Sequence, residues 1–226
     1  MPGQFDFTVR GKEDLIRAVE EFGVVPLFRN SVPGFSVEEH VSPRAWFSDE
    51  PGVWEWKGPV IRETGCAYGK FFEHKAAFVS REVFLDLANY RRDGYDMDAR
   101  YEEGLARHRD KRLFDLVEQN GPILSRKLRQ LGDYRRGGQK GFEAAMLSLQ
   151  EQCYVLISDF VYQRDRFGRL YGFGVAEYST PERFMGGDFT EKVYAREPEE
   201  SRLRLLALLR RLLPDAEERL LTRLLG

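Results

Sequence analysis

The spacing of apolar residues changes near Cys153, and this change restricts the fold more than any other feature of the chain. Before that point, apolar residues recur at i, i+3, i+4 and i+7, as in an amphipathic helix: Phe142, Ala145, Met146 and Leu149. After it, residues 153–164 and 169–179 alternate with a period of two, on either side of a turn at 165–168 that contains glycine. Two alternating segments around such a turn predict a β-hairpin.

Two further helices are predicted before this transition. Residues 106–120 carry apolar side chains at helical spacing and stop at a glycine. In residues 123–132 we expect Ser125 to be the N-cap, with Leu128 and Leu131 as the buried pair. Three short helices followed by a hairpin is the element order of a winged helix-turn-helix, which we assign to residues 106–184.

The N-terminal region, residues 1–105, is predicted to be helical and aromatic. The segment Glu13–Gly23 has helical spacing and a glycine at its end, and Ser80 is placed to cap a second helix. Ser36 and Glu39 have the spacing of a capping box. The three tryptophans, Trp46, Trp54 and Trp56, have two interpretations. We favour anchors in the core over platforms that stack on nucleic-acid bases.

Residues 185–226 are predicted to form a C-terminal helical hairpin. Leucines are dense between positions 203 and 213, and Pro214 separates this first helix from a second. The stripe is expected to pack on its own domain, with a homodimer through the leucine-rich helix as the alternative. The predicted fold class is therefore α+β and mainly helical, with a central winged helix-turn-helix whose wing is a β-hairpin.

Composition excludes several classes of protein. Hydrophobic residues at 42% and charged residues at 32% are typical of a globular chain. Two distant cysteines, Cys66 and Cys153, cannot form a disulfide scaffold or a four-cysteine zinc site and suit a reducing compartment. The first residues show no signal-peptide pattern, and no apolar run could span a bilayer, so we expect a cytoplasmic protein that does not enter membranes.

Charge is unevenly distributed along the chain. The net charge is −2, which argues against a surface that is basic throughout. Between residues 121 and 170, however, basic residues outnumber acidic ones. We predict that eight of them contact DNA phosphates, with a solvated face as the alternative: Arg126, Lys127, Arg135, Arg136, Lys140, Arg164, Arg166 and Arg169. In a winged helix, the third helix would face the groove and the hairpin the backbone.

Two blocks of sequence carry a family resemblance. Residues 113–182, LFDLVEQNGPILSRKLRQL to EYSTPE, have a helix ending in Gly-Pro, a serine-led helix, a lysine-initiated helix and a wing ending in Tyr-x-x-Pro-Glu. The preceding YGKFFEHKAAFVS has an aromatic-x-x-His-x-Ala arrangement. Together they resemble the AlkZ/YcaQ family of winged-helix DNA glycosylases, and most closely its AlkZ-related branch, over about residues 10–185. The resemblance implies double-stranded, damaged DNA as partner and no cofactor.

The same resemblance suggests catalytic candidates. These glycosylases hydrolyse the N-glycosidic bond of alkylated or cross-linked purines with a Gln-x-Gln or Gln-x-Asp pair in their first module. Here a Gln-x-Gln stands where the third helix enters the wing, at Gln150 and Gln152. An amide can position and polarise a water beside an oxocarbenium-like sugar. The pair is thus the candidate catalytic site of a monofunctional glycosylase, with ordinary helix-end polar residues as the alternative.

Other chemistry finds no support in the sequence. The three histidines, His40, His74 and His108, lack a partner at metal-ligand spacing, and His74 is expected to be a core or interface residue. The acidic segment 93–103 lacks the alternation of an EF-hand and is interpreted as a solvated turn. The glycines at 137–141 lack P-loop spacing. Apart from glycosylase chemistry, the remaining hypothesis is a non-catalytic interaction module or dimeric regulator.

Overall fold

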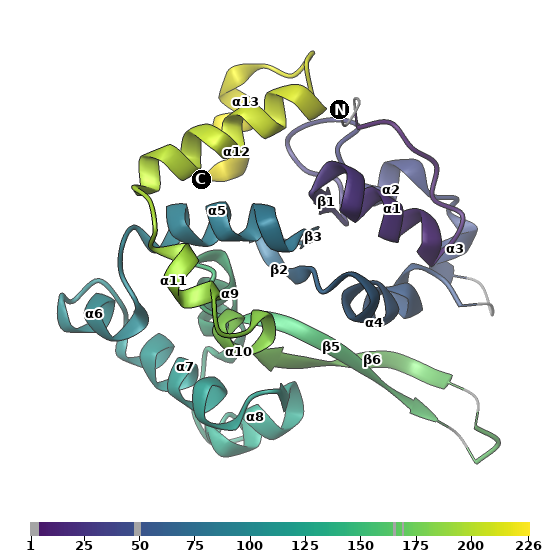
Figure 1. Ribbon diagram of the computed structural model, residues 1–226. Coiled ribbons are helices and arrows are strands. Elements are labelled where there is room, and N and C mark those ends of the chain that lie inside the picture. The colour runs from purple at the N-terminus through teal and green to yellow at the C-terminus, as the bar shows by residue number, and fades with distance from the viewer. Residues whose placement is uncertain (1–4, 48–50, 165, 169) are drawn as a thin grey trace.

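The computed structural model describes residues 5–47, 51–164, 166–168 and 170–226. Short helices surround a six-stranded antiparallel sheet of order β1-β3-β2-β5-β6-β4 (Figure 1). The strands are β1 (Val24–Pro26), β2 (Ala67–Phe72), β3 (Lys75–Val79), β4 (Ile123–Leu124), β5 (Leu156–Arg164) and β6 (Leu170–Ser179). Tyr68 of β2 pairs with Ile157 of β5, so one sheet crosses the boundary predicted at residues 105 and 106.

The helices before the predicted winged helix are α1 (Lys12–Phe22), α2 (Val37–His40), α3 (Arg44–Phe47), α4 (Val53–Thr64), α5 (Arg81–Arg92) and α6 (Met97–Glu102). The helices after the β5–β6 hairpin are α10 (Pro181–Met185), α11 (Phe189–Val193), α12 (Pro198–Leu212) and α13 (Glu218–Leu225). The predicted helices at 13–23 and after Ser80 are confirmed. Ser36, however, does not cap α2 with its side chain; its hydroxyl donates to Glu39 Oε2 at 2.6 Å.

The central segment consists of α7 (His108–Asn120), β4, α8 (Ser125–Leu131), α9 (Phe142–Glu151) and the hairpin β5–β6. The hairpin and all three helices are confirmed, and the four apolar residues predicted on the buried face of α9 are all buried. Two details of α8 were wrong. Leu124 is the N-cap and Ser125 the first helical residue, and Leu131 is 42% exposed because the chain turns away directly after it.

A β2–β3 hairpin was not predicted from the sequence. Its two-residue turn is Glu73–His74, and both residues have positive φ, 47° and 62°. Glycine and asparagine normally occupy such turns, so the usual sequence signal is missing. The turn is held from outside, because Glu73 Oε2 accepts a hydrogen bond of 3.0 Å from the backbone N–H of Ser31.

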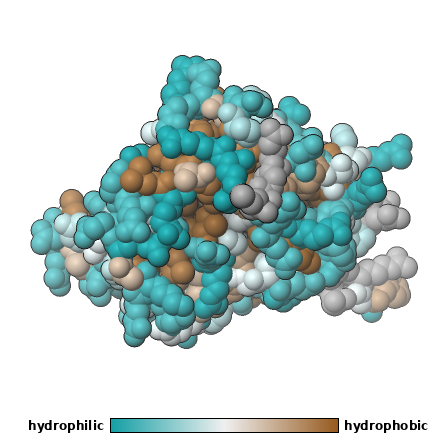
Figure 2. All heavy atoms as spheres, turned by 45° about the horizontal axis from the view of Figure 1, so that its top comes forward, coloured by the Kyte–Doolittle hydropathy of each residue, from teal (hydrophilic) through white to brown (hydrophobic). Residues whose placement is uncertain are grey.

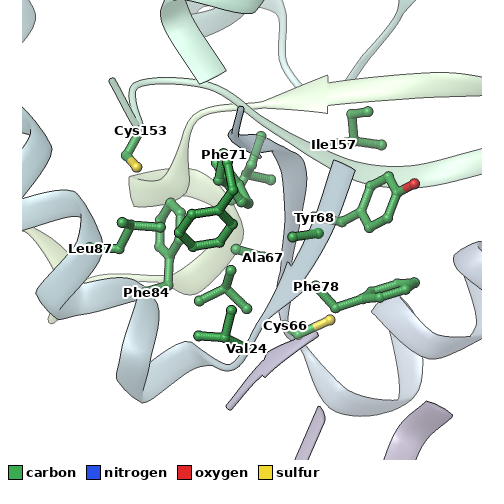
Figure 3. Packing of buried hydrophobic residues seen from close by; sticks show 14 of the residues in the cluster. Val24, Cys66, Ala67, Tyr68, Phe71, Phe78, Phe84, Leu87, Cys153 and Ile157 are labelled. Atoms are coloured by element: carbon green, nitrogen blue, oxygen red, sulfur yellow. The ribbon is translucent and has the colours of Figure 1, made fainter. Parts of the chain in front are cut away.

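One continuous core joins the sheet to the helices (Figure 3). Phe71 of β2 packs against Phe84 of α5 with ring centroids 5.3 Å apart, close to Leu87 and Cys153. Cys66 and Cys153 are both free and buried. Burial raises the pKa of each thiol to about 12, so neither is prepared to act as a nucleophile.

Polar groups buried on α5 fix the C-terminal helices. Asp86, 8% exposed, accepts hydrogen bonds from Arg196, Arg204 and Ser201. These contacts dock α12 along α5, at the top of Figure 1. Most leucines of the predicted stripe are buried in this packing, whereas Leu203 is 53% exposed. The face that carries α12 and α13 is largely hydrophilic, with apolar atoms in hollows between hydrophilic ridges (Figure 2).

Buried Arg92 joins α5 to the centre of the molecule. Its Nη1 donates to Glu182 Oε1 at 2.6 Å and its Nη2 to the carbonyl of Cys153 at 2.9 Å. A guanidinium that is only 1% exposed needs such partners, since an unpaired buried charge is costly. No helix within the described ranges is both long and apolar enough to cross a membrane.

Candidate nucleic-acid interface

Five of the predicted DNA-contact residues lie close together in sequence and are exposed. Arg126 and Lys127 are on α8, and the other three, Arg135, Arg136 and Lys140, are in the connection to α9. Within the part of the chain that the structure describes, none of the five forms an ion pair. Cations without a carboxylate partner can bind phosphate oxygens without first breaking an internal contact.

The hairpin tip supplies another cation. Arg166 is exposed, with its guanidinium carbon 4.7 Å from the centroid of the Phe167 ring. The hairpin projects beyond the helices at the lower right of Figure 1. Arg164 belongs to β5, but its side chain is outside the described set, and Arg169 lies outside the described residues.

Arg129, between the free cations, is engaged in the fold instead. It pairs with Glu143, and its guanidinium carbon lies 3.9 Å from the centroid of the Phe142 ring. It therefore ties α8 to the first turn of α9. This helix packs against both α7 and β2. Its exposed residues are Glu143 and Ala144, so α9 presents no cation to solvent.

Gln150 is buried near the end of α9, with 2% of its surface exposed. Its Nε2 donates to the carbonyl of Met146 at 2.9 Å, and its Oε1 accepts from the backbone N–H of Lys70 at 3.1 Å. A Cβ at Gly69 would lie 2.8 Å from the Phe71 ring and 3.2 Å from the same oxygen, so the glycine makes room for the ring and the amide. Gln150 thus connects α9 to β2.

Gln152, the C-cap of α9, has different partners. Its Nε2 donates to Ser148 Oγ at 2.7 Å and to the Ser148 carbonyl at 3.2 Å. Both contacts stay within its own helix, whereas the contact of Gln150 with Lys70 reaches the sheet. The catalytic assignment of Gln150 and Gln152 stays a prediction.

Between the two glutamines lies a contact that sequence reasoning missed. Glu151 Oε1 is 2.5 Å from Nδ1 of His74, at the β2–β3 turn. No acidic partner of His74 could be found from the sequence, because Glu151 is 77 positions away. Of the two expected places for His74, core or interface, the core is wrong, because its side chain is 71% exposed. An exposed imidazole beside a carboxylate can hold or transfer a proton. No cluster of metal-binding side chains occurs among residues that the structure describes.

Comparison with known proteins identifies the family. Residues 9–226 match the model of the family described as AlkZ related. The chain belongs to this AlkZ-related family. No curated protein and no solved structure matches it significantly.

The family assignment confirms the resemblance and extends it. The AlkZ-related match includes the free cations, the Gln150–Gln152 segment and the β2–β3 turn. It also continues beyond residue 185, where the resemblance was expected to stop, through α12 and α13. The C-terminal helical hairpin is therefore part of the family's extent and not an addition to it.

Proposed function

We propose that residues 106–184 form a winged helix and that this AlkZ-related protein binds double-stranded DNA through it. The order helix, strand, helix, helix, hairpin supports the assignment, as does the pairing of β4 with β6 and of β6 with β5. In this arrangement β4 is the short strand after the first helix, and β5–β6 is the wing.

The observation that carries the proposal is the group of exposed cations on α8 and the α8–α9 connection that form no ion pair with any residue the structure describes. They flank a helix that presents no cation of its own. DNA contacts are therefore made mainly with phosphates, and base readout by α9 is minor. A near-neutral protein can bind a polyanion in this way if its cations are concentrated on one surface.

Salt dependence of binding tests the interface. Anisotropy of a labelled duplex is measured for the wild type and for a variant with Arg135→Ala and Arg136→Ala. The slope of log K against log salt becomes shallower by about 0.9 for each phosphate that the variant no longer neutralises, hence by roughly two. Arg10→Ala with Arg211→Ala is the matched control, because both are exposed and, among described residues, neither forms an ion pair.

The control variant keeps the wild-type slope, while Arg166→Ala reduces it by about one if the wing contacts DNA. Undetectable binding, or binding that salt does not affect, contradicts the proposal. If log K falls with log salt equally steeply for the Arg135/Arg136 variant and for its control, the electrostatic attraction between protein and DNA is not localised on this surface.

Base excision is the candidate activity of the same protein. It is supported by the family relationship and by the contact between His74 and Glu151, the residue that lies between Gln150 and Gln152 in the sequence. Alkylated and cross-linked duplexes are incubated with the protein and then cleaved with alkali at abasic sites. The Gln150→Ala, Gln152→Ala protein is expected to lose excision and still bind DNA.

Because Gln150 is also structural, Gln152→Ala alone and His74→Ala are tested beside the double variant, each with a melting curve. Full excision by a folded double variant would exclude the glutamines. Absence of excision by the wild type on every duplex would favour a non-catalytic DNA-binding module.

A further inference from the structure

An aromatic cavity of about 310 Å³ lies far in sequence from the proposed DNA interface. Three segments supply its rings: Phe28 follows β1, Trp46 is on α3 and Trp54 is on α4. The centroid of Trp46 is 5.7 Å from that of Phe28 and 5.3 Å from that of Trp54. The volume of the cavity is at the lower end of the range for small-molecule sites. Aromatic walls favour a ligand with a planar aromatic ring, which can stack on them.

The rim of the cavity provides both a hydrogen-bond acceptor and donors. Glu38 Oε2 accepts from the backbone N–H of Arg29 at 2.9 Å. Within the described part of the chain, the other oxygen, Oε1, has no hydrogen-bond partner, and the exposed Arg29 guanidinium has no ion pair. A ligand that fits this rim has N–H donors for the carboxylate and a carbonyl for the guanidinium.

Nearby charge argues against a cationic guest. Lys57 Nζ lies 4.8 Å from the centroid of Trp54, so one aromatic wall already interacts with a cation. Arg29 adds a second positive charge at the rim. An uncharged planar heterocycle avoids both repulsions. Among nucleobases, guanine carries two adjacent N–H donor groups and a carbonyl along one edge.

We infer that this cavity binds a neutral guanine base, stacked on the tryptophan walls, with its N–H edge on Glu38 and its carbonyl towards Arg29. The inference rests on other residues than the proposed DNA interface, so either can fail alone. Proteins that act on DNA bases read an extruded base by stacking and by hydrogen bonds to its pairing edge. Free guanosine offers the same groups.

The test is a titration of the protein with guanosine. Binding is measured by calorimetry and by tryptophan fluorescence, which is excited at the red edge of the tryptophan absorption band. The chain has only three tryptophans, and Trp56, whose Nε1 donates to the Pro51 carbonyl, does not line the cavity. Saturable binding that quenches fluorescence is expected. Glu38→Gln and Trp46→Leu weaken it about tenfold or more, whereas Trp56→Phe leaves it unchanged.

Ligand comparisons on the wild type keep the inference testable even if a variant is unstable. Adenosine, which lacks the donor pair, binds about tenfold more weakly than guanosine. Equal affinity for the two nucleosides, tighter binding of cationic 7-methylguanosine, or no saturable binding of guanosine would each overturn the inference. The Arg135/Arg136 variant binds guanosine like the wild type, which separates this result from that of the DNA experiment.

Discussion

Lys57 offers a sharp test of the electrostatics behind the aromatic cavity. The residue is 8% exposed, and its Nζ lies 4.0 Å from the centroid of Phe160 and 4.8 Å from that of Trp54. Among described residues it has no carboxylate partner within ion-pair distance. Burial lowers the pKa of Lys57 from 10.5 to about 8, because the ammonium loses its hydration.

The free energy involved follows from this shift. A fall of the pKa from 10.5 to about 8 corresponds to about 3 kcal/mol of destabilisation while the amine is charged in both folded and unfolded chains. Lys57→Met removes the charge and keeps a flexible apolar chain, so we expect it to stabilise the protein at pH 7 by about 3 kcal/mol.

Urea denaturation at several pH values measures the effect and its sign. Between the folded pKa of about 8 and the unfolded value of 10.5, the unfolded state binds more protons, so wild-type stability rises with pH. The advantage of Lys57→Met is therefore full below pH 8 and disappears above 10.5. Exposed Lys70→Met is the control and shows no such trend. A Lys57→Met protein that is less stable at pH 7, or an advantage independent of pH, would refute the reasoning.

Three further predictions concern the core and the C-terminal helices. Because burial raises the pKa of Cys66 and Cys153 to about 12, a thiol reagent at pH 8 labels neither in the folded protein and both in urea; rapid native labelling would contradict this. Asp86→Ala removes the acceptor of the arginines and the serine that dock α12, and we expect it to lower the free energy of unfolding in urea by about 2 kcal/mol. The control Glu199→Ala, in an exposed ion pair, changes the free energy of unfolding little. Light scattering gives a monomer, because α12 buries most of its leucines against its own chain and leaves Leu203 exposed; a dimer that dissociates on Leu203→Glu would show the opposite.

The local pattern of apolar residues was sufficient to predict the elements whose buried positions recur regularly along the chain. The buried positions of α9 recur with the helical period, and the hairpin β5–β6 alternates, so both could be predicted from neighbouring residues. The β2–β3 turn could not be predicted in this way. Neither Glu73 nor His74 marks such a turn in a sequence as glycine or asparagine does, and Ser31 and Glu151, which hold them, are remote in sequence.

The candidate site depended on contacts that no local pattern contains. The cations of the α8–α9 connection could be proposed as DNA contacts from the sequence, because an exposed charge needs no partner elsewhere in the chain to hold it. The role of Gln150 could not, since its acceptor oxygen serves Lys70, 80 positions away. Likewise, the tryptophans were interpreted as core anchors, yet Trp46 and Trp54 line a cavity, and Trp46 does so while it remains packed on the core. An amphipathic aromatic side chain can serve both purposes.

The aromatic cavity and the hairpin are separate surfaces, but the structure links them rigidly. Pro59 inside α4 has no N–H to offer the carbonyl of Glu55. The Tyr162 hydroxyl of β5 reaches that gap, lying 3.4 Å from this carbonyl and donating to the carbonyl of Trp54 at 2.7 Å. Arg62 of α4 also pairs with Asp159 of β5 at 2.5 Å. The hairpin that we propose as the wing is therefore attached directly to the helix that carries Trp54.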